Sequence, residues 1–153
     1  MIAYLGIGTN LGDRDANIRT ALSLLRERVG EMLRCSAPYH SAPVGFVSDN
    51  AFVNIVVSFR TSLSPRALLA VTQDIERAMG RTEKSVNGQY RDRIIDIDLL
   101  FCLADNGEPL PCSFPDLTLW IAFPLCSVST CHPISNQIVV CFITLAGLPT
   151  ATE

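Results

Sequence analysis

The sequence lacks any run of about 20 uncharged apolar residues, so it offers no candidate for a membrane-spanning helix. Its N-terminus, MIAYLGIG, has neither a basic segment nor a cleavage site, which argues against a signal peptide. The six cysteines include no C-x-x-C pair, so no zinc site is expected. The net charge is −3, which gives no indication of a basic surface for nucleic acid. We therefore expect a cytoplasmic protein with free thiols that binds neither membranes nor nucleic acid.

Charged residues are also missing near the end of the chain. No Asp, Glu, Lys or Arg occurs from Leu117 to Thr152, and five of the six cysteines follow residue 101. We therefore divide the chain into a core domain, residues 1–116, and a divergent charge-free segment, residues 117–153. This break is typical of a reading-frame change or of an unusual C-terminal replacement, and the sequence leaves both open. With so few charges, the segment is expected to order poorly.

The core domain is predicted to alternate between strands and helices. Short apolar or alternating runs predict strands at residues 2–8, 32–39, 51–60 and 94–101. Helical spacing of apolar residues predicts helices at about 13–29 and 64–79, each with a capping residue before it and a glycine after it. The order β-α-β-β-α-β indicates an α+β, ferredoxin-like core, here with an atypical C-terminal extension. Many functions use this fold, so it identifies none.

Two aspartates, Asp96 and Asp98, interrupt the last predicted strand. Because side chains alternate along a strand, both carboxylates face the same side, about 7 Å apart. Two carboxylates this close repel each other unless a cation lies near them. Magnesium suits such oxygen ligands when substrate phosphates complete its coordination shell. A solvent-facing pair on an edge strand is the plain alternative, and the apolar flanking residues make it less convincing.

A basic segment immediately precedes the acidic pair and contains Arg81, Lys84, Arg91 and Arg93. Guanidinium groups beside metal ligands are suited to a polyphosphate, because they share its charge with the metal. For Lys84 and Arg91 we favour a solvated loop. Arg93 stands three residues before Asp96 and is expected to serve the same ligand. No P-loop and no complete G-x-G-x-x-G motif is present, so a nucleotide must be held by other means.

Several segments together resemble the 6-hydroxymethyl-7,8-dihydropterin pyrophosphokinase family over roughly residues 1–101. The matching segments are residues 3–12 (AYLGIGTNLG), 41–45 (SAPVG), 52–54 (FVN), 73–76 (QDIE), 80–81 (GR) and 93–100 (RIIDIDLL). The resemblance implies transfer of pyrophosphate from ATP to 6-hydroxymethyl-7,8-dihydropterin in folate biosynthesis, with AMP released. It also implies two Mg²⁺ ions that act with ATP, and we expect a monomer.

The resemblance implies a role for each matching residue. Asp96 and Asp98 correspond to the metal ligands, and Arg81 and Arg93 to arginines that assist transfer. The implied pterin site consists of Ser41, Pro43, Val44, Gly45, Phe52 and Asn54. The implied ATP site consists of Gln73, Glu76, Arg93 and Leu99. Phe52 has an alternative role in the core, whereas Asn54 is harder to explain by packing, because an unpaired buried amide is costly.

The resemblance weakens after Phe101. Pro115 to Leu119 still match, but the histidine and arginine expected after residue 119 are absent, and residues 120–123 (WIAF) stand in their place. Two other functions therefore stay open: a catalytically impaired module that still binds pterin and metal–nucleotide, and an unrelated ferredoxin-like ligand sensor with a chance D-x-D. Release of AMP from Mg-ATP and the pterin would separate the enzyme from both.

Overall fold

The structure is a computed structural model that describes residues 1–43, 47–81 and 92–110. The chain divides into two compact units, Met1–Ile121 and Ala122–Glu153, and all described residues belong to the first. The domain boundary predicted between residues 116 and 117 therefore lies outside the described residues. In the part of the chain that is described, neither helix is long and apolar enough to cross a membrane.

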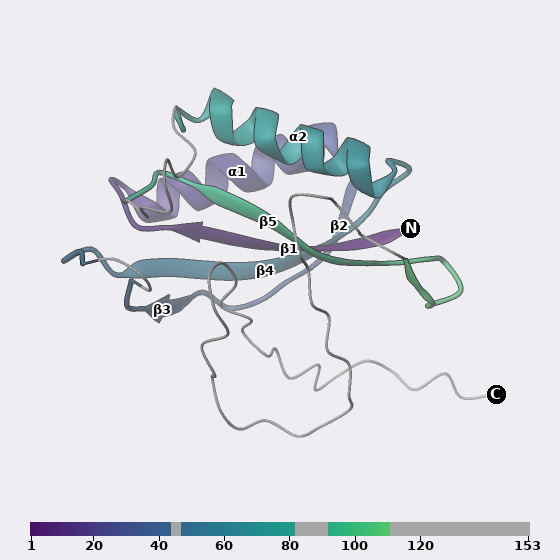
Figure 1. Cartoon of the computed structure of the whole chain (residues 1–153), viewed down its shortest axis with the longest axis horizontal. Helices are drawn as coiled ribbons and strands as arrows, with labels where there is room; N and C mark the ends of the chain where they lie inside the picture. The colour runs from purple at the N-terminus through teal and green to yellow at the C-terminus, as the bar shows by residue number, and fades with distance from the viewer. Residues whose placement is uncertain (44–46, 82–91, 111–153) are drawn as a thin grey trace, which may run out of the picture. The chain divides into compact units, whose positions relative to one another are not determined.

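Two helices cover one face of an antiparallel sheet (Figure 1). The strands are β1 (Ile2–Thr9), β2 (Glu31–Cys35), β3 (Tyr39–Ser41), β4 (Phe52–Arg60), β5 (Asp96–Leu103) and β6 (Pro109–Leu110), and the helices are α1 (Arg14–Arg28) and α2 (Pro65–Ala78). The mixed α/β class and the positions of both helices agree with prediction. The second strand ends earlier than expected, at Cys35. The short strands β3 and β6 were not expected, because two or three residues carry no readable alternation.

Strand β1 lies at the centre of the sheet. The strand order is β2-β4-β1-β5-β6, with β3 paired to β4, and β1 is antiparallel to both of its neighbours. Gly8 of β1 is opposite Asn54 of β4 on one side and Asp96 of β5 on the other. Gly6 is opposite Asp98 in the same way. The register thus brings the predicted pterin-binding residue Asn54 and the predicted metal ligands to one region of the sheet.

Local signals in the sequence fix the ends of both helices. Asp13 caps α1, because its Oδ1 accepts a hydrogen bond of 2.9 Å from the N–H three residues later. Ser64 caps α2 through a hydrogen bond of 3.3 Å with the same spacing. Gly80 follows α2 with φ of 96°, a left-handed conformation that glycine adopts without steric cost. This turn directs the next residue, Arg81, back toward β5.

The hydrophobic core lies between the helices and the sheet. Alternate residues of β1, β4 and β5 point toward α1 and α2, and the largest fully buried side chains include Phe59, Leu5, Ile7, Leu25, Leu68 and Ile75. The residues between them point to the opposite face of the sheet, which neither described helix covers (Figure 1). Tyr4 and Phe101 stack on this face, with ring centroids 4.2 Å apart. Of the predicted site residues, Phe52 and Asn54 of β4 and Asp96 and Asp98 of β5 lie on the same face.

Candidate active site

Asp96 and Asp98 share one face of β5, as the strand alternation predicted. Ile97 and Leu99, which alternate with them, are 4% and 3% exposed and pack into the core, whereas Asp98 is exposed and Asp96 is half-buried. The neighbouring positions on β1 are Gly6 and Gly8, which have no side chains to fill the space beside the carboxylates. The carboxylates therefore stand on an open part of the sheet surface.

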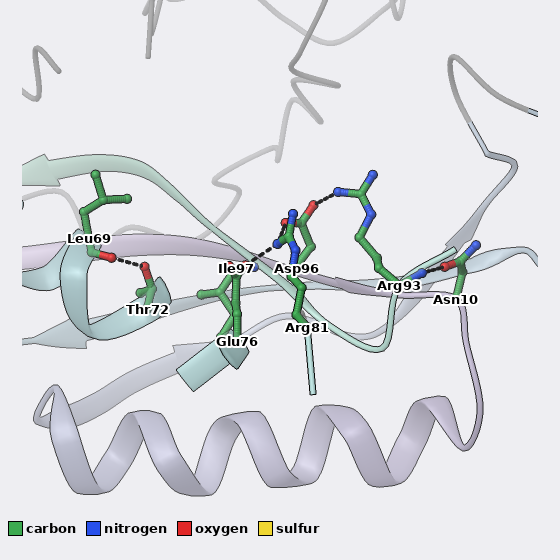
Figure 2. A network of polar contacts seen from close by, with 8 residues as sticks. All are labelled: Asn10, Leu69, Thr72, Glu76, Arg81, Arg93, Asp96 and Ile97. Carbon is green, nitrogen blue, oxygen red and sulfur yellow. Dashed lines mark hydrogen bonds and ion pairs between the residues drawn. The ribbon is translucent and has the colours of Figure 1, made fainter. Parts of the chain in front are cut away.

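Two arginines hold the carboxylate of Asp96 from both sides (Figure 2). Nη1 of Arg81 donates to Oδ1, and Nη1 of Arg93 donates to Oδ2. The three side chains are only 17–20% exposed, so solvent screens these ion pairs less than it would on an open surface. The structure thus brings Arg93 to Asp96, as its spacing predicted, and adds Arg81 from the end of α2.

The other carboxylate, Asp98, is electrostatically frustrated. Although Asp98 keeps access to solvent, the protein packed around it desolvates its carboxylate, and this effect, followed by repulsion from Asp96 and Glu76, raises the pKa of Asp98 to about 7. A cation between the two aspartates would relieve that repulsion. No group of three or more His, Cys, Asp or Glu side chains in the described ranges could hold a metal by itself. The donor set therefore suits Mg²⁺, which binds through one or two carboxylates and takes further oxygens from phosphates and water.

Glu76, in the last turn of α2, joins the same network (Figure 2). Its Oε1 accepts hydrogen bonds from Nη1 of Arg81 at 2.6 Å and from the backbone N–H of Ile97 at 2.7 Å. Burial raises the pKa of Glu76 to about 7, although Arg81 and the Ile97 amide act in the opposite direction. Both hydrogen bonds to Oε1 of Glu76 thus come from protein groups that lie beside the aspartate pair.

A second group of predicted residues lies across β1 from the aspartates. Nδ2 of Asn54 donates to Oγ of Ser41 at 3.0 Å, which ties β4 to β3. A Cβ added at Gly8 would lie 2.9 Å from Oδ1 of Asn54, closer than such contacts normally come. The ring of Phe52 lies below the guanidinium of Arg93, whose carbon is 5.6 Å from the ring centroid. Phe52 therefore links the Asn54 side of the site to the Asp96 side.

The remaining predicted residues divide into three groups. Pro43 is half-buried just after β3, whereas Val44 and Gly45 lie outside the described residues. Gln73 is half-buried on α2. The side chain of Leu99 is only 3% exposed and belongs to the core, so the nucleotide contact expected for this residue would have to come from its backbone.

Sequence reasoning missed Asn10, which is only 2% exposed. Its Nδ2 donates to Oδ1 of Asp92 at 2.7 Å and to the carbonyl of Asn50 at 3.2 Å, and its Oδ1 accepts from the N–H of Arg93 at 2.8 Å. Asn10 lies within the matching segment 3–12, but we expected no role for it. Its position in the sequence could have indicated its role. Asn10 lies between a buried strand and a helix cap, and a side-chain amide that is buried there requires hydrogen-bond partners.

The comparisons with known proteins agree on one family. The family model described as 7,8-dihydro-6-hydroxymethylpterin-pyrophosphokinase matches residues 4–130. A 2-amino-4-hydroxy-6-hydroxymethyldihydropteridine pyrophosphokinase from Porphyromonas gingivalis is 50% identical over 99 residues, which cover 65% of this chain and 67% of the relative. The protein of that name from Methylorubrum extorquens is 33% identical over 142 residues, or 90% of this chain and 88% of the relative. The family-model match and the Methylorubrum extorquens match extend beyond residue 101, where we expected the resemblance to weaken.

One solved structure matches at the level of the fold. Its title is "Crystal Structure Analysis of the HPPK-DHPS in complex with substrates", and it aligns with a TM-score of 0.51 at 20% sequence identity. The alignment covers 65% of this chain and 27% of that chain, so this chain spans about a quarter of that protein. At this identity the match supports the architecture and carries no information on individual site residues.

Proposed function

This chain belongs to the 7,8-dihydro-6-hydroxymethylpterin-pyrophosphokinase family, and we propose that the Asp96–Asp98 face of its sheet is the site of pyrophosphate transfer. The reaction moves pyrophosphate from ATP to 6-hydroxymethyl-7,8-dihydropterin in folate biosynthesis. The hydroxymethyl oxygen forms a bond to the β-phosphorus of ATP while the bond from that phosphorus to the oxygen shared with the α-phosphate breaks. AMP leaves, and the hydroxyl proton passes to solvent. The observation that carries the proposal is the aspartate pair with two arginines on one carboxylate.

Asp96 and Asp98 would hold magnesium, and we propose two ions that act with ATP. Bound magnesium neutralises phosphate charge and polarises the β-phosphorus. The exposed carboxylate of Asp98 is repelled by Asp96, and the neighbouring glycines of β1 leave room above the strand. Both features favour a site that takes the rest of its ligands from the substrate.

Arg81 and Arg93 would transfer from Asp96 to the phosphates when metal and nucleotide bind. A metal between the aspartates competes with the guanidinium groups for the same oxygens. The phosphates offer these arginines an alternative acceptor of higher charge, and arginine binds such oxygens through two parallel hydrogen bonds. The arginines would then stabilise the charge that develops on the transferred group.

The pterin would lie across β1 from the metal, against Phe52 and Asn54. An amide that carries both donors and an acceptor can read the edge of a heterocycle, and the hydrogen bond to Ser41 fixes its orientation. Phe52 would pack on the ring, and Pro43, Val44 and Gly45, which follow β3 in the sequence, would complete the pterin site. Because Arg93 contacts both Phe52 and Asp96, the pterin hydroxymethyl group would come close to the phosphates.

The nucleotide base would bind along the outer edge of β5. The N–H of Ile97 points outward to Glu76, so the N–H of Leu99, two residues later, points the same way. Leu99 would therefore contribute to the nucleotide site through its backbone. Gln73 and Glu76 lie on α2, which packs beside this strand.

Four finer assignments belong to the same proposal. We propose a ferredoxin-like topology, supported by the element order β1-α1-β2-β4-α2-β5 around the short β3. We further propose an atypical extension after residue 116, a monomeric state and a cytoplasmic location. A module that binds ligands without turnover is not favoured, because the family match runs to residue 130 and thus beyond the start of the charge-free segment.

The test is a product assay with Mg-ATP and 6-hydroxymethyl-7,8-dihydropterin. We expect equal amounts of AMP and the pterin pyrophosphate, and no AMP when either the pterin or magnesium is omitted. Asp98→Asn should abolish product formation, whereas Asp74→Asn, at an exposed ion pair on α2, should leave it unchanged. Pterin binding without AMP in the wild type would contradict the proposal.

A further inference from the structure

One oxygen of Glu76 connects a helix, a strand edge and an arginine. Oε1 accepts from the N–H of Ile97 at 2.7 Å and from Nη1 of Arg81 at 2.6 Å (Figure 2). Ile97 stands between Asp96 and Asp98, and Arg81 donates to Asp96. Glu76 is therefore connected to both proposed metal ligands indirectly. It contacts Ile97, which is their common neighbour in the sequence, and Arg81, which contacts Asp96.

Within the described ranges, the hydrogen bond from the Ile97 N–H to Glu76 takes the place of a bond to a neighbouring strand. In this part of the structure β6 pairs with β5 only at Cys102 and Leu103, so it does not reach Ile97. A buried N–H that lacks an acceptor is costly, and Ile97 is 4% exposed. The carboxylate of Glu76 supplies that acceptor, and an ionised acceptor forms a stronger hydrogen bond than a neutral one. It thereby fixes the backbone that sets the spacing of the two aspartates.

The contact with Arg81 gives Glu76 a second effect on the site. Arg81 is anchored to Glu76 twice, since its backbone N–H also donates to the Glu76 carbonyl at 3.0 Å. The guanidinium is therefore held beside Asp96 by a group that a metal ion would not displace. If Asp96 bound a metal ion, Arg81 would keep its hydrogen bond to Glu76 and would remain beside the phosphates.

We propose that Glu76 is a positioning residue, which sets the aspartate spacing through Ile97 and the direction of Arg81, and that it does not contact ATP. This inference rests on the proposed function and refines the expectation that Glu76 binds the nucleotide. Its side chain is 12% exposed, and its Oε1 is used twice within the protein. A carboxylate would also repel the triphosphate.

Two substitutions and a control test the proposal with two independent measurements. The variants are Glu76→Ala, Glu76→Gln and the control Asp74→Asn, which alters an exposed ion pair on the same helix. Amide hydrogen exchange by NMR, on the protein without ligands, reports the Ile97 hydrogen bond. Steady-state kinetics with Mg-ATP and the pterin report kcat and KM separately.

For Glu76→Ala we expect protection of the Ile97 amide to fall about tenfold or more while central-strand amides such as Ile7 keep theirs. Its kcat should fall about 10–100-fold, the usual effect of removing a group that orients metal ligands, with KM for ATP nearly unchanged. Glu76→Gln should keep the Ile97 protection, because an amide oxygen still accepts, and lose only part of kcat through Arg81. Asp74→Asn should match the wild type.

Three results would overturn the positioning role. These are unchanged Ile97 protection in Glu76→Ala, a rise in KM for ATP with kcat unchanged, or a wild-type kcat in Glu76→Gln. The last of these decides the matter if Glu76→Ala does not fold. Lost Ile97 protection in a chain whose wild type forms no AMP would support the positioning role and overturn the proposed function alone.

Discussion

The guanidinium of Arg93 donates to Oδ2 of Asp96, three residues along the chain, while Arg81 occupies the other oxygen of the same carboxylate. Two cations on one proposed metal ligand compete with the metal. These two guanidinium groups also lie beside the proposed position of the phosphates. Metal binding and phosphate binding are therefore coupled through these two side chains.

Removal of Arg93 should have opposite effects on metal affinity and on turnover. Without nucleotide, Arg93→Ala should bind Mn²⁺ about three- to tenfold more tightly, because it loses a competing charge interaction worth about 1 kcal/mol. Its turnover should fall about 100-fold or more, because a donor to the transferred phosphate is lost. Titration of Mn²⁺ by electron paramagnetic resonance and the AMP assay measure the two effects. Arg77→Ala, at an exposed ion pair, is the control, and weaker Mn²⁺ binding in Arg93→Ala would contradict the competition.

Gly8→Ala should weaken pterin binding without weakening nucleotide binding. The new Cβ would lie 2.9 Å from Oδ1 of Asn54, so Asn54 must move and lose its alignment with Ser41. We expect the Kd of the pterin to rise about tenfold, since loss of one oriented hydrogen bond costs about 1–1.5 kcal/mol. Calorimetry with the pterin measures this change.

Gly6→Ala is the matched control for that experiment. Its Cβ would meet the flexible side chain of Leu100 at an ordinary 3.4 Å, on the same strand and the same face. We expect a pterin Kd within about twofold of the wild type, because methyl groups that fit cost little. Equal losses in both variants would show that β1 as a whole, and not the Asn54 contact, determines pterin affinity.

Asn10→Ala should destabilise the fold. The substitution leaves the Arg93 N–H, the Asn50 carbonyl and Asp92 without their shared partner in a buried position. We expect the free energy of unfolding to fall by about 1–3 kcal/mol, the cost of buried polar groups that lose their hydrogen bonds. Urea denaturation measures it. Asn17→Ala, which removes a neighbouring but more exposed amide, should cost less, and the reverse order would contradict this account.

The pH dependence of stability should carry the signature of Glu76. Its pKa is raised from 4.5 to about 7, so the folded state binds more protons than the unfolded state between these values. The contribution of Glu76 to the free energy of unfolding therefore declines as pH rises from about 4.5 to about 7. Asp98 has the same sign, with its pKa raised from 3.8 to about 7.

The difference between wild type and Glu76→Gln isolates this contribution from the other carboxylates. In buffer with a chelator, we expect Glu76→Gln to gain stability relative to the wild type as pH rises through that range. Urea denaturation at a series of pH values measures the difference. A difference that does not vary with pH would show that the pKa of Glu76 is not raised.

Local sequence signals predicted the parts of the site that lie on one element. Alternation along β5 was enough to put Asp96 and Asp98 on one face, and a spacing of three residues was enough to bring Arg93 to Asp96. The contacts of Arg81 and Glu76 were not predictable in this way, because they depend on how the end of α2 packs beside β5. Asn10 was missed for the same reason, since its partners lie 40 and 82 residues away.

Strand β5 also shows which part of Leu99 is available to a ligand. The family motif that includes Leu99 suggested a role for that residue, and period-two alternation with Asp96 and Asp98 already placed its side chain on the opposite face. The structure confirms that burial, which restricts any ligand contact to the backbone. The short strands β3 and β6 were missed because they are formed by pairing with β4 and β5 and not by their own pattern.

The most direct test of the account is Mn²⁺ binding in the presence of α,β-methylene ATP, which cannot be cleaved between its α- and β-phosphorus atoms. We predict that the analogue strengthens Mn²⁺ binding to the wild-type protein. The affinity of Mn²⁺ for the complex of protein and analogue should also exceed the affinity of Mn²⁺ for the analogue in the absence of protein. Asp98→Asn should lose this enhancement while Asp74→Asn keeps it. Undiminished enhancement in Asp98→Asn would contradict the claim that the aspartate pair of β5 holds the metal.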